Sequence, residues 1–232
     1  MNFSPNALKQ VVVFQHATDE DLNLIFQNSI PRSIEEGGFF FLQGDEAQYL
    51  HILTSGQVKL MQSNHSGQQV NLRTIYPWQM FGALGIVRSD ATYPATAHAL
   101  ENSSALAVNS QFLHSMLETR PYLSFDLMTL MTSYIQEMQA RYRELATERV
   151  EQRVANALIR LAGQTGVRAE KEAEIVLSFS RQDVAEMTGT TLYTISRLLS
   201  EWERKGVIKT GRERINIINP HELVRIADGL VK

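Results

Sequence analysis

One predicted helix carries the side chains that are best suited to recognise another molecule. Residues 192–205 show apolar residues at helical spacing, which form one face: Ile195, Leu198, Leu199 and Trp202. The opposite face is polar and consists of Tyr193, Ser196, Arg197 and Ser200. Such a helix fits the major groove of DNA, where an arginine fork can donate to both O6 and N7 of guanine. Arg197 is therefore the candidate base reader, with Ser196 close to a base edge or a phosphate.

Other side chains near this helix suit a supporting role in the same interface. We expect Tyr193 and its neighbour Leu192 to pack on thymine methyl groups. Phosphate contacts fix the register of a protein on DNA without reading its sequence, and four residues suit them: Arg181, Thr191, Arg212 and Arg214. The alternative is that these residues are the solvated surface of a small domain without DNA binding. Only the first interpretation predicts an affinity for DNA that falls steeply with salt.

Two capped helices and a hairpin position these side chains. The first helix begins after Ser180, which has an acid three residues on, and stops at Gly189. Thr191 and the threonine before it cap the second helix. Residues 207–218 then alternate apolar and polar positions around a glycine turn, which predicts a β-hairpin. This order is that of a winged helix–turn–helix, which we assign to residues 149–232.

A long helical segment precedes this domain. Pro121 opens it, and no Gly or Pro interrupts residues 122–162. A narrow apolar stripe predicts that residues 118–148 form a dimerisation helix with this seam: Leu123, Leu127, Leu130, Met131, Tyr134, Met138 and Leu145. The alternative is a helix that packs on its own domain. We expect a hinge near Thr147–Glu151, inside the part of the helix that is richest in charge.

The N-terminal half has the sequence pattern of a β-domain, which we assign to residues 1–117. Its short apolar runs are separated by glycine-containing turns: 39–42, 49–53, 58–61, 70–75 and 106–108. Turn signals at roughly 8–12-residue spacing predict an antiparallel sandwich or barrel. Ser66 and Gly67 mark a hairpin turn, and a short helix follows the capping residue Thr18.

Composition narrows the functional classes. The chain of 232 residues has no cysteine, which excludes disulfides, thiolate nucleophiles and cysteine-ligated metal or iron–sulfur sites. No HExxH, GxSxG or phosphate-binding glycine loop occurs, so we expect no enzyme and no metal site. Residues 1–148 hold 8 Lys+Arg against 14 Asp+Glu, a balance of −6, and residues 149–232 hold 14 against 11, a balance of +3. The lack of a signal peptide or long apolar segment predicts a cytoplasmic protein that does not enter membranes.

Five segments resemble the CRP/FNR family of bacterial transcription regulators. They are LATERVEQRVANALIRLA (145–162), FSRQDVAEMTGTTLYTISRLLSEWERKGVI (179–208), GQVKLMQ (56–62), FGALGIV (81–87) and YPATAHAL (93–100). The resemblance implies an α+β chain: a double-stranded β-helix (jelly-roll) sensor domain of the cyclic-nucleotide-binding type, a long dimerisation helix and a winged helix–turn–helix. It also implies a homodimer on a palindromic operator. RNA polymerase is implied as a partner, through residues 163–174 and the hairpin tip 64–67.

The sequence departs from this family where an effector would bind. Members that bind cyclic AMP carry Gly-Glu where this chain has Gly82-Ala83, and Arg-Ser where it has Tyr93-Pro94. An unpaired phosphate in an apolar roll costs several kcal/mol, so we do not expect cyclic AMP. Another effector would then lie near Gly82, Ala83, Tyr93 and Pro94, opposite Tyr134. The same aromatic residues could instead simply fill the roll.

The sequence is compatible with several ways of controlling the activity of such a regulator. Haem is one, as in the family's gas sensors, with five histidines as candidate ligands, of which His16 suits best: His16, His51, His65, His98 and His114. A protein ligand and control by abundance are others. The reading helix also departs from the family, because many members carry Glu where Tyr193 stands and cyclic-AMP-responsive members carry Arg at Leu192. We therefore expect an operator that keeps the guanine read by Arg197 and differs at neighbouring steps.

Overall fold

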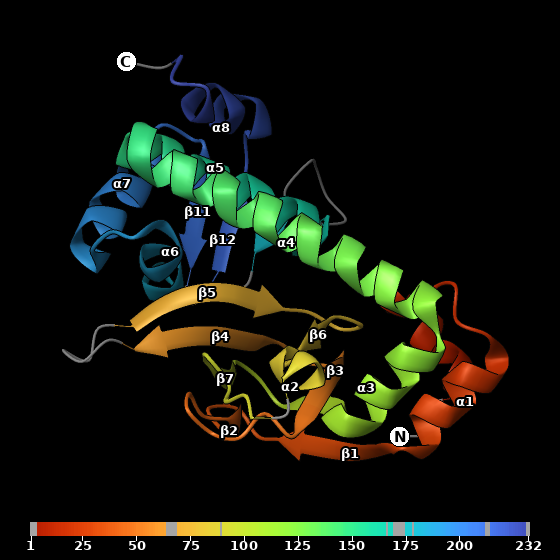
Figure 1. Ribbon diagram of the computed structural model, residues 1–232. Helices are drawn as coiled ribbons and strands as arrows, with labels where there is room; N and C mark the ends of the chain where they lie inside the picture. The colour runs from red at the N-terminus through yellow and green to blue at the C-terminus, as the bar shows by residue number, and fades with distance from the viewer. Residues whose placement is uncertain are drawn as a thin grey trace. The chain divides into compact units, whose positions relative to one another are not determined.

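The computed structural model describes residues 4–63, 69–88, 90–165, 167–168, 175–177, 179–211 and 214–230 (Figure 1). The chain forms two compact units that divide between Glu137 and Met138. This division falls inside α4 (Pro121–Thr147), so the helix contributes to both units.

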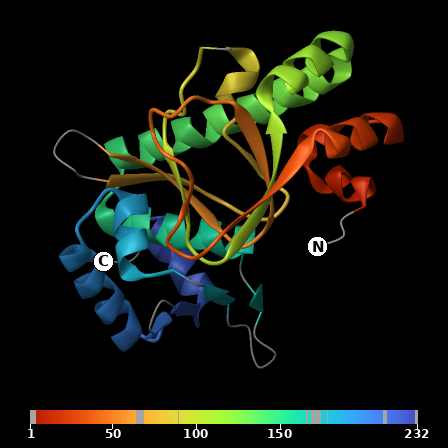
Figure 2. The ribbon, with the colours of Figure 1, turned by 90° about the horizontal axis from the view of Figure 1, so that it is seen from below.

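The first unit is an antiparallel β-roll, as predicted. Its two four-stranded sheets have the orders β1-β8-β3-β6 and β2-β7-β4-β5. The strands wrap around a common interior (Figure 2), and their bounds are β1 Ser29–Ile34, β2 Phe39–Phe41, β3 Tyr49–Ser55, β4 Val58–Ser63, β5 Gln69–Ile75, β6 Met80–Phe81, β7 Thr96–Ala99 and β8 Ser103–Asn109. The predicted hairpin of β4 and β5 is confirmed, although its tip, residues 64–68, lies outside the described residues.

Both faces of the β3 strand are buried, which explains its continuous apolar run. Leu50 and Ile52 point to the outer face of the roll and pack with the N-terminal segment and the helices that follow β8. His51 and Leu53 point to the other face, where Leu53 packs with the roll's internal cluster and His51 contacts its aromatic rings. Because successive side chains of a strand point to opposite faces, neighbouring residues of β3 lie in two different cores.

Helices cover the outer face of the first sheet. The N-terminal segment has two 3₁₀ helices, Pro5–Gln10 and Val12–Phe14, and then α1 (Asp19–Gln27). Short α2 (Leu84–Val87) follows β6, and α3 (Ser110–Thr119) follows β8. The helix predicted after Thr18 is confirmed, because the Thr18 hydroxyl accepts from the Asp21 backbone N–H at 3.2 Å and thereby caps α1.

Several elements of the first unit were not predicted, among them β1 and α3. Strand β1 contains Pro31 and is almost entirely exposed, because it is the edge strand of its sheet; an edge strand tolerates proline and lacks an apolar pattern. Helix α3 is capped by Asn109, whose side chain accepts from two backbone N–H groups. Asn109 is a recognisable N-cap residue in the sequence. It is also the last residue of strand β8, so no loop marks the start of the helix.

The helical stretch from Pro121 breaks inside the predicted hinge. Helix α4 ends at Thr147 and α5 (Val150–Thr165) begins three residues later. Glu148 holds the break: its backbone carbonyl accepts from Arg153 Nη1 at 3.1 Å, and its carboxylate accepts from Asn156 Nδ2 at 3.0 Å. Arg153 Nε also donates to the carbonyl of Thr188 at 3.3 Å. The break is therefore tied to the second unit.

The second unit is a winged helix–turn–helix, as predicted. Its small sheet has the order β11-β12-β10-β9. After α5 its elements are β9 Val167–Arg168, β10 Ile175–Leu177, α6 Arg181–Thr188, α7 Leu192–Arg204, β11 Ile208–Gly211, β12 Arg214–Ile217 and α8 Pro220–Ala227. Helix α8 was not predicted; Asn219 caps it and Pro220 occupies its first turn. Within the described residues, no helix combines the length and hydrophobicity that crossing a bilayer requires.

Candidate nucleic-acid interface

The turn between α6 and α7 is fixed by side-chain caps. Ser180 and Asp183 form a reciprocal capping box at the start of α6, and Gly189 ends that helix in the left-handed region at φ 61°. Thr191 caps α7 by accepting from the Thr194 backbone N–H at 3.1 Å. A side chain at Gly189 would also approach Leu145 of α4, with a Cβ at 3.3 Å from its Cδ2. The sequence signals for these caps are therefore realised in the structure.

Helix α7 has the two faces that the sequence predicts. Ile195, Leu198, Leu199 and Trp202 are all buried. On the other face, the side chains of Tyr193 and Leu192 are 79% and 47% exposed. Arg197 is exposed as well, and Ser196 is half-buried. The candidate reading residues thus share one accessible face of one capped helix.

Arg181 differs from a free surface cation. Its Nη2 donates to Thr210 Oγ1 on β11 at 3.0 Å. Glu203 of α7 accepts from the Thr210 backbone N–H at 2.8 Å and from its hydroxyl at 3.0 Å, and these bonds lower the pKa of the Glu203 carboxyl. The start of α6, the end of α7 and the hairpin are held together by this network. A phosphate contact by Arg181 would extend the network outward.

The remaining phosphate candidates lie on the hairpin and at the start of α7. Thr191 is exposed, and its hydroxyl lies 2.9 Å from the hydroxyl of Thr194. Arg214 is exposed on β12 and pairs in register with Gly211 of β11. Arg212 lies outside the described residues. The structure therefore brings Thr191, Arg181 and Arg214 into the same unit as the reading face.

The predicted dimer seam divides into two faces of α4. Leu123 is buried, and Leu127 and Leu130 pack against the core of the roll. Tyr134 lies under Arg73 of β5, whose guanidinium carbon is 3.8 Å from the ring centroid. These four residues hold the helix on its own domain, which was the alternative interpretation. Met131, Met138 and Leu145 are exposed instead.

The three exposed seam residues belong to a longer apolar strip that helical spacing alone does not separate from the packed face. We call it the α4 strip; its members are Met128, Met131, Ile135, Met138, Tyr142 and Leu145. Their exposed fractions are 59%, 38%, 56%, 70%, 75% and 54%, in chain order. They alternate in steps of three and four residues, the spacing of a coiled-coil seam.

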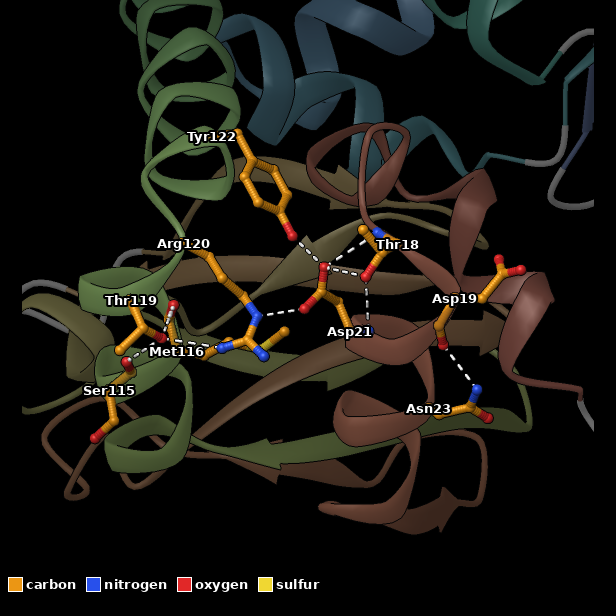
Figure 3. Close-up of polar contacts among 9 residues, drawn as sticks. All are labelled: Thr18, Asp19, Asp21, Asn23, Ser115, Met116, Thr119, Arg120 and Tyr122. Atoms are coloured by element: carbon orange, nitrogen blue, oxygen red, sulfur yellow. Dashed lines mark hydrogen bonds and ion pairs between the residues drawn. The ribbon is translucent and has the colours of Figure 1, made fainter.

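The start of α4 is anchored by a buried carboxylate. Asp21 accepts hydrogen bonds from Arg120, Tyr122 and Thr18, all directed at it in Figure 3. Burial alone would raise the pKa of Asp21, but these hydrogen bonds outweigh it and lower the pKa to about 2. Asp21 is only 3% exposed. The network joins α1 to the junction of α3 and α4.

A pocket of about 300 Å³ lies between the roll and α4 within the first unit. Gly82, Ala83 and Tyr134 line it, together with Arg73. Tyr93 and Pro94 do not. Tyr93 points into the roll instead, because its ring stacks on Phe41 at 3.6 Å and its hydroxyl donates to the Tyr49 carbonyl at 2.7 Å.

These residues do not fit a cyclic nucleotide held in the family's manner. The position of the phosphate-pairing Arg is occupied by Tyr93, whose hydroxyl is already bonded on both sides to the Tyr49 backbone. The position of the ribose-binding Glu is Ala83, which has no acceptor.

Four of the candidate haem ligands lie in the described residues, and His51 is the least suited to bind iron. His16 Nδ1 lies 3.1 Å from the Asp126 carboxylate, and His114 Nδ1 lies 2.8 Å from the Ile86 carbonyl. His98 packs on Phe39. His51 is enclosed by aromatic rings, and burial, aided by Arg32, lowers its pKa to about 4. His65 lies outside the described residues.

Two family models match the chain, each over one unit. They are the cyclic nucleotide-binding domain, over residues 31–120, and the Crp-like helix-turn-helix domain, over residues 152–226. The chain is 26% identical over 198 residues to the transcriptional activator protein anr of Pseudomonas aeruginosa, covering 85% of this chain and 80% of that protein. It is 26% identical over 223 residues to the cyclic AMP receptor protein of Thermus thermophilus, covering 96% and 100%.

A solved structure shows the same fold. FixK2 from Bradyrhizobium japonicum superposes with a TM-score of 0.75 at 19% identity, over 85% of this chain and 96% of that one. The two domain models occur in the order in which the β-roll and the helix–turn–helix were found, and the relatives are regulators and not enzymes. The chain therefore belongs to the CRP/FNR family of DNA-binding transcription regulators.

Proposed function

We propose that the protein acts as a homodimer that binds a palindromic operator and contacts RNA polymerase. Its activity is set by an effector of the roll other than cyclic AMP, or by its abundance. The observation that carries the dimer is the α4 strip, in which six apolar side chains on one helix face are between 38% and 75% exposed. A second copy of the strip would bury them at coiled-coil spacing.

DNA reading is assigned to α7. Arg197 donates to guanine in the major groove, and Tyr193 and Leu192 contact the neighbouring thymines. Thr191, Arg181, Arg214 and Arg212 contact phosphates. In a dimer, the two α7 helices must stand about 34 Å apart to enter successive major grooves on one face of the duplex. Tyr193 is bulky and carries no carboxylate, so it does not replace the family's Glu, and the operator differs at that step.

The polymerase contact is assigned by family position to residues 163–174 and to the hairpin tip 64–67. Most of these residues lie outside the described part of the chain. The effector is assigned to the pocket beside α4. A ligand there changes DNA binding only if its affinity differs between two arrangements of the dimer.

The test is selection of sites from random DNA by purified, ligand-free protein at near-physiological salt. We expect enrichment of a palindrome whose half-sites are one helical turn apart and whose guanine is retained while adjacent steps differ from the family's usual site. Single half-sites, or an unaltered family site, would contradict the dimer or the reading of Tyr193. Retention without any motif would contradict a DNA-competent free dimer.

A pair of variants on α7 isolates the base contact. Arg197→Ala is expected to cost about 1–3 kcal/mol of operator affinity and to relax preference at one base pair, because a bidentate guanine contact is lost. Arg204→Ala is the matched control, since Arg204 is an exposed arginine in the last turn of α7. Quantitative binding to the selected site and to its single-base variants measures both. Equal losses for the two variants on all sequences would remove Arg197 from base reading.

A further inference from the structure

The pocket beside α4 is built for an apolar molecule of small size. Its volume of about 300 Å³ is at the lower end of small-molecule sites. Its walls come from the roll, α2 and α4, and are mainly apolar: Leu60, Ile75, Met80, Phe81, Leu127 and Met131. Gly82 and Ala83 contribute no polar side chain.

One charged side chain lines this pocket. Arg73 reaches it from β5, with its guanidinium over the Tyr134 ring. Glu137 and Arg73 both line a second pocket of about 250 Å³, but Glu137 does not line the first. The first pocket therefore has positive charge and no acid of its own.

This combination selects among ligand classes. A guanidinium fork matches a carboxylate in two parallel hydrogen bonds, and apolar walls favour an apolar body. A nucleotide brings ribose hydroxyls and base edges, and polar groups left unpaired against apolar walls weaken binding. A neutral apolar molecule offers the guanidinium no hydrogen-bond acceptor. A monoanion with an apolar body satisfies both the charge and the walls.

We propose that this pocket binds a small apolar monocarboxylic acid and that Arg73 pairs with its carboxylate. The inference deepens the proposed function, on which it rests for its regulatory meaning. Met131 provides the physical link, because it lines the pocket and is also a member of the α4 strip. An acid in the pocket contacts a side chain of the proposed dimer seam.

Calorimetric titration of the full chain tests the binding. The probes are phenylacetate and octanoate, which separate aromatic from aliphatic acids, each with its neutral amide, phenylacetamide or octanamide, as control. We expect at least one acid to bind and its amide to bind about tenfold or more weakly, because the charge-assisted hydrogen bonds are lost. An amide that binds as tightly as its acid would overturn the proposal, as would the absence of binding by both acids.

Two arginine variants make the test specific. Arg73→Gln is expected to weaken acid binding about tenfold or more, and Ala83→Leu to weaken it by filling the pocket. Arg32→Gln is the matched control, because Arg32 also lies over a tyrosine ring, 5.9 Å from the centroid of Tyr49, but does not line the pocket. Unchanged acid binding by a folded Arg73→Gln protein would overturn the assignment. Circular dichroism checks that each variant is folded.

Failure of this inference is distinguishable from failure of the proposed function. The titrations contain no DNA, and the site selection contains no acid. An enriched palindrome without acid binding would leave the DNA function standing and remove the ligand class. Acid binding that depends on Arg73 without any selected DNA site would do the reverse.

Discussion

The two faces of α4 have similar composition but different surroundings. One face is made by Leu123, Leu127, Leu130 and Tyr134, which pack on the roll of the same chain. The other face is the α4 strip, whose six members are exposed. Both faces advance in steps of three and four residues. Helical spacing therefore shows that a face is apolar, but it does not show what covers it.

The extent of each stripe along the helix is more informative than its spacing. The packed stripe runs into Glu137 and Arg141 after Tyr134, close to where the first unit ends. The α4 strip stays apolar as far as Leu145. An apolar stripe that continues beyond the domain on which it begins must be covered by something else. We propose that the second copy of the chain covers it.

The largest effect is expected on the exposed face. Ile135→Asp would place an unpaired carboxylate in the proposed seam, which costs at least about 3 kcal/mol of dimer stability. We expect a monomer by analytical ultracentrifugation at concentrations where the parent protein is a dimer, with much weaker operator binding. Gln136→Asp adds the same charge one residue away, at an exposed position outside the strip, and should leave the dimer intact. A dimeric Ile135→Asp protein would show that the strip is not the seam.

The packed face is expected to respond in stability and not in assembly. Leu123→Ala removes a side chain that is 1% exposed and should lower the free energy of unfolding by about 2–5 kcal/mol, since a cavity remains. Urea denaturation at a fixed protein concentration measures this loss, and ultracentrifugation should still find a dimer. Ile30→Ala, at a position that is 50% exposed on edge strand β1, is the control and should cost far less. Dissociation of the Leu123→Ala dimer would contradict the assignment of this face to packing within one chain.

A smaller, pH-dependent effect is expected where the packed face begins. The pKa of Asp21 is lowered from 3.8 to about 2 in the folded protein, so the unfolded chain takes up this proton first as the pH falls. The stabilisation of about 2 kcal/mol is complete above pH 3.8 and is lost as the pH falls through about 2. Asp21→Asn should remove this part of the acid dependence of the urea midpoint.

The control for the pH experiment is a neighbouring carboxylate. Asp19 has a side chain that is 73% exposed and pairs with Lys9 at the surface. Asp19→Asn should therefore retain the acid dependence of the parent protein. If Asp21→Asn also retains it, the hydrogen bonds from Arg120 and Tyr122 do not stabilise the carboxylate as the structure indicates.

The helix–turn–helix could be predicted because its determinants are local. Ser180, Gly189 and Thr191 act on helix ends within a few residues of themselves, so the sequence pattern and the structure coincide. The β-roll could be predicted as a class for the same reason, from turns between short apolar runs. Edge strand β1 was not predicted, because its outward side chains need no apolar pattern.

The effector pocket and the seam could be predicted only in part, because they depend on contacts between distant segments. Tyr93 was expected to line the pocket, but its position is set by Phe41 and by the backbone of Tyr49, more than forty residues earlier in the chain. Arg73 was not singled out at all, since nothing near it in sequence shows that it meets Tyr134. Such pairings follow from how the strands and α4 come together.

The α4 strip is chemically soft. Three of its six members are methionines: Met128, Met131 and Met138. Methionine is unbranched and polarisable, and it refits irregular gaps at little energetic cost. A seam of this kind can change its crossing angle by repacking its thioethers, whereas a seam of branched residues resists such adjustment. Graded control of DNA binding would then follow from the deformability of the seam and would not require the helices to separate.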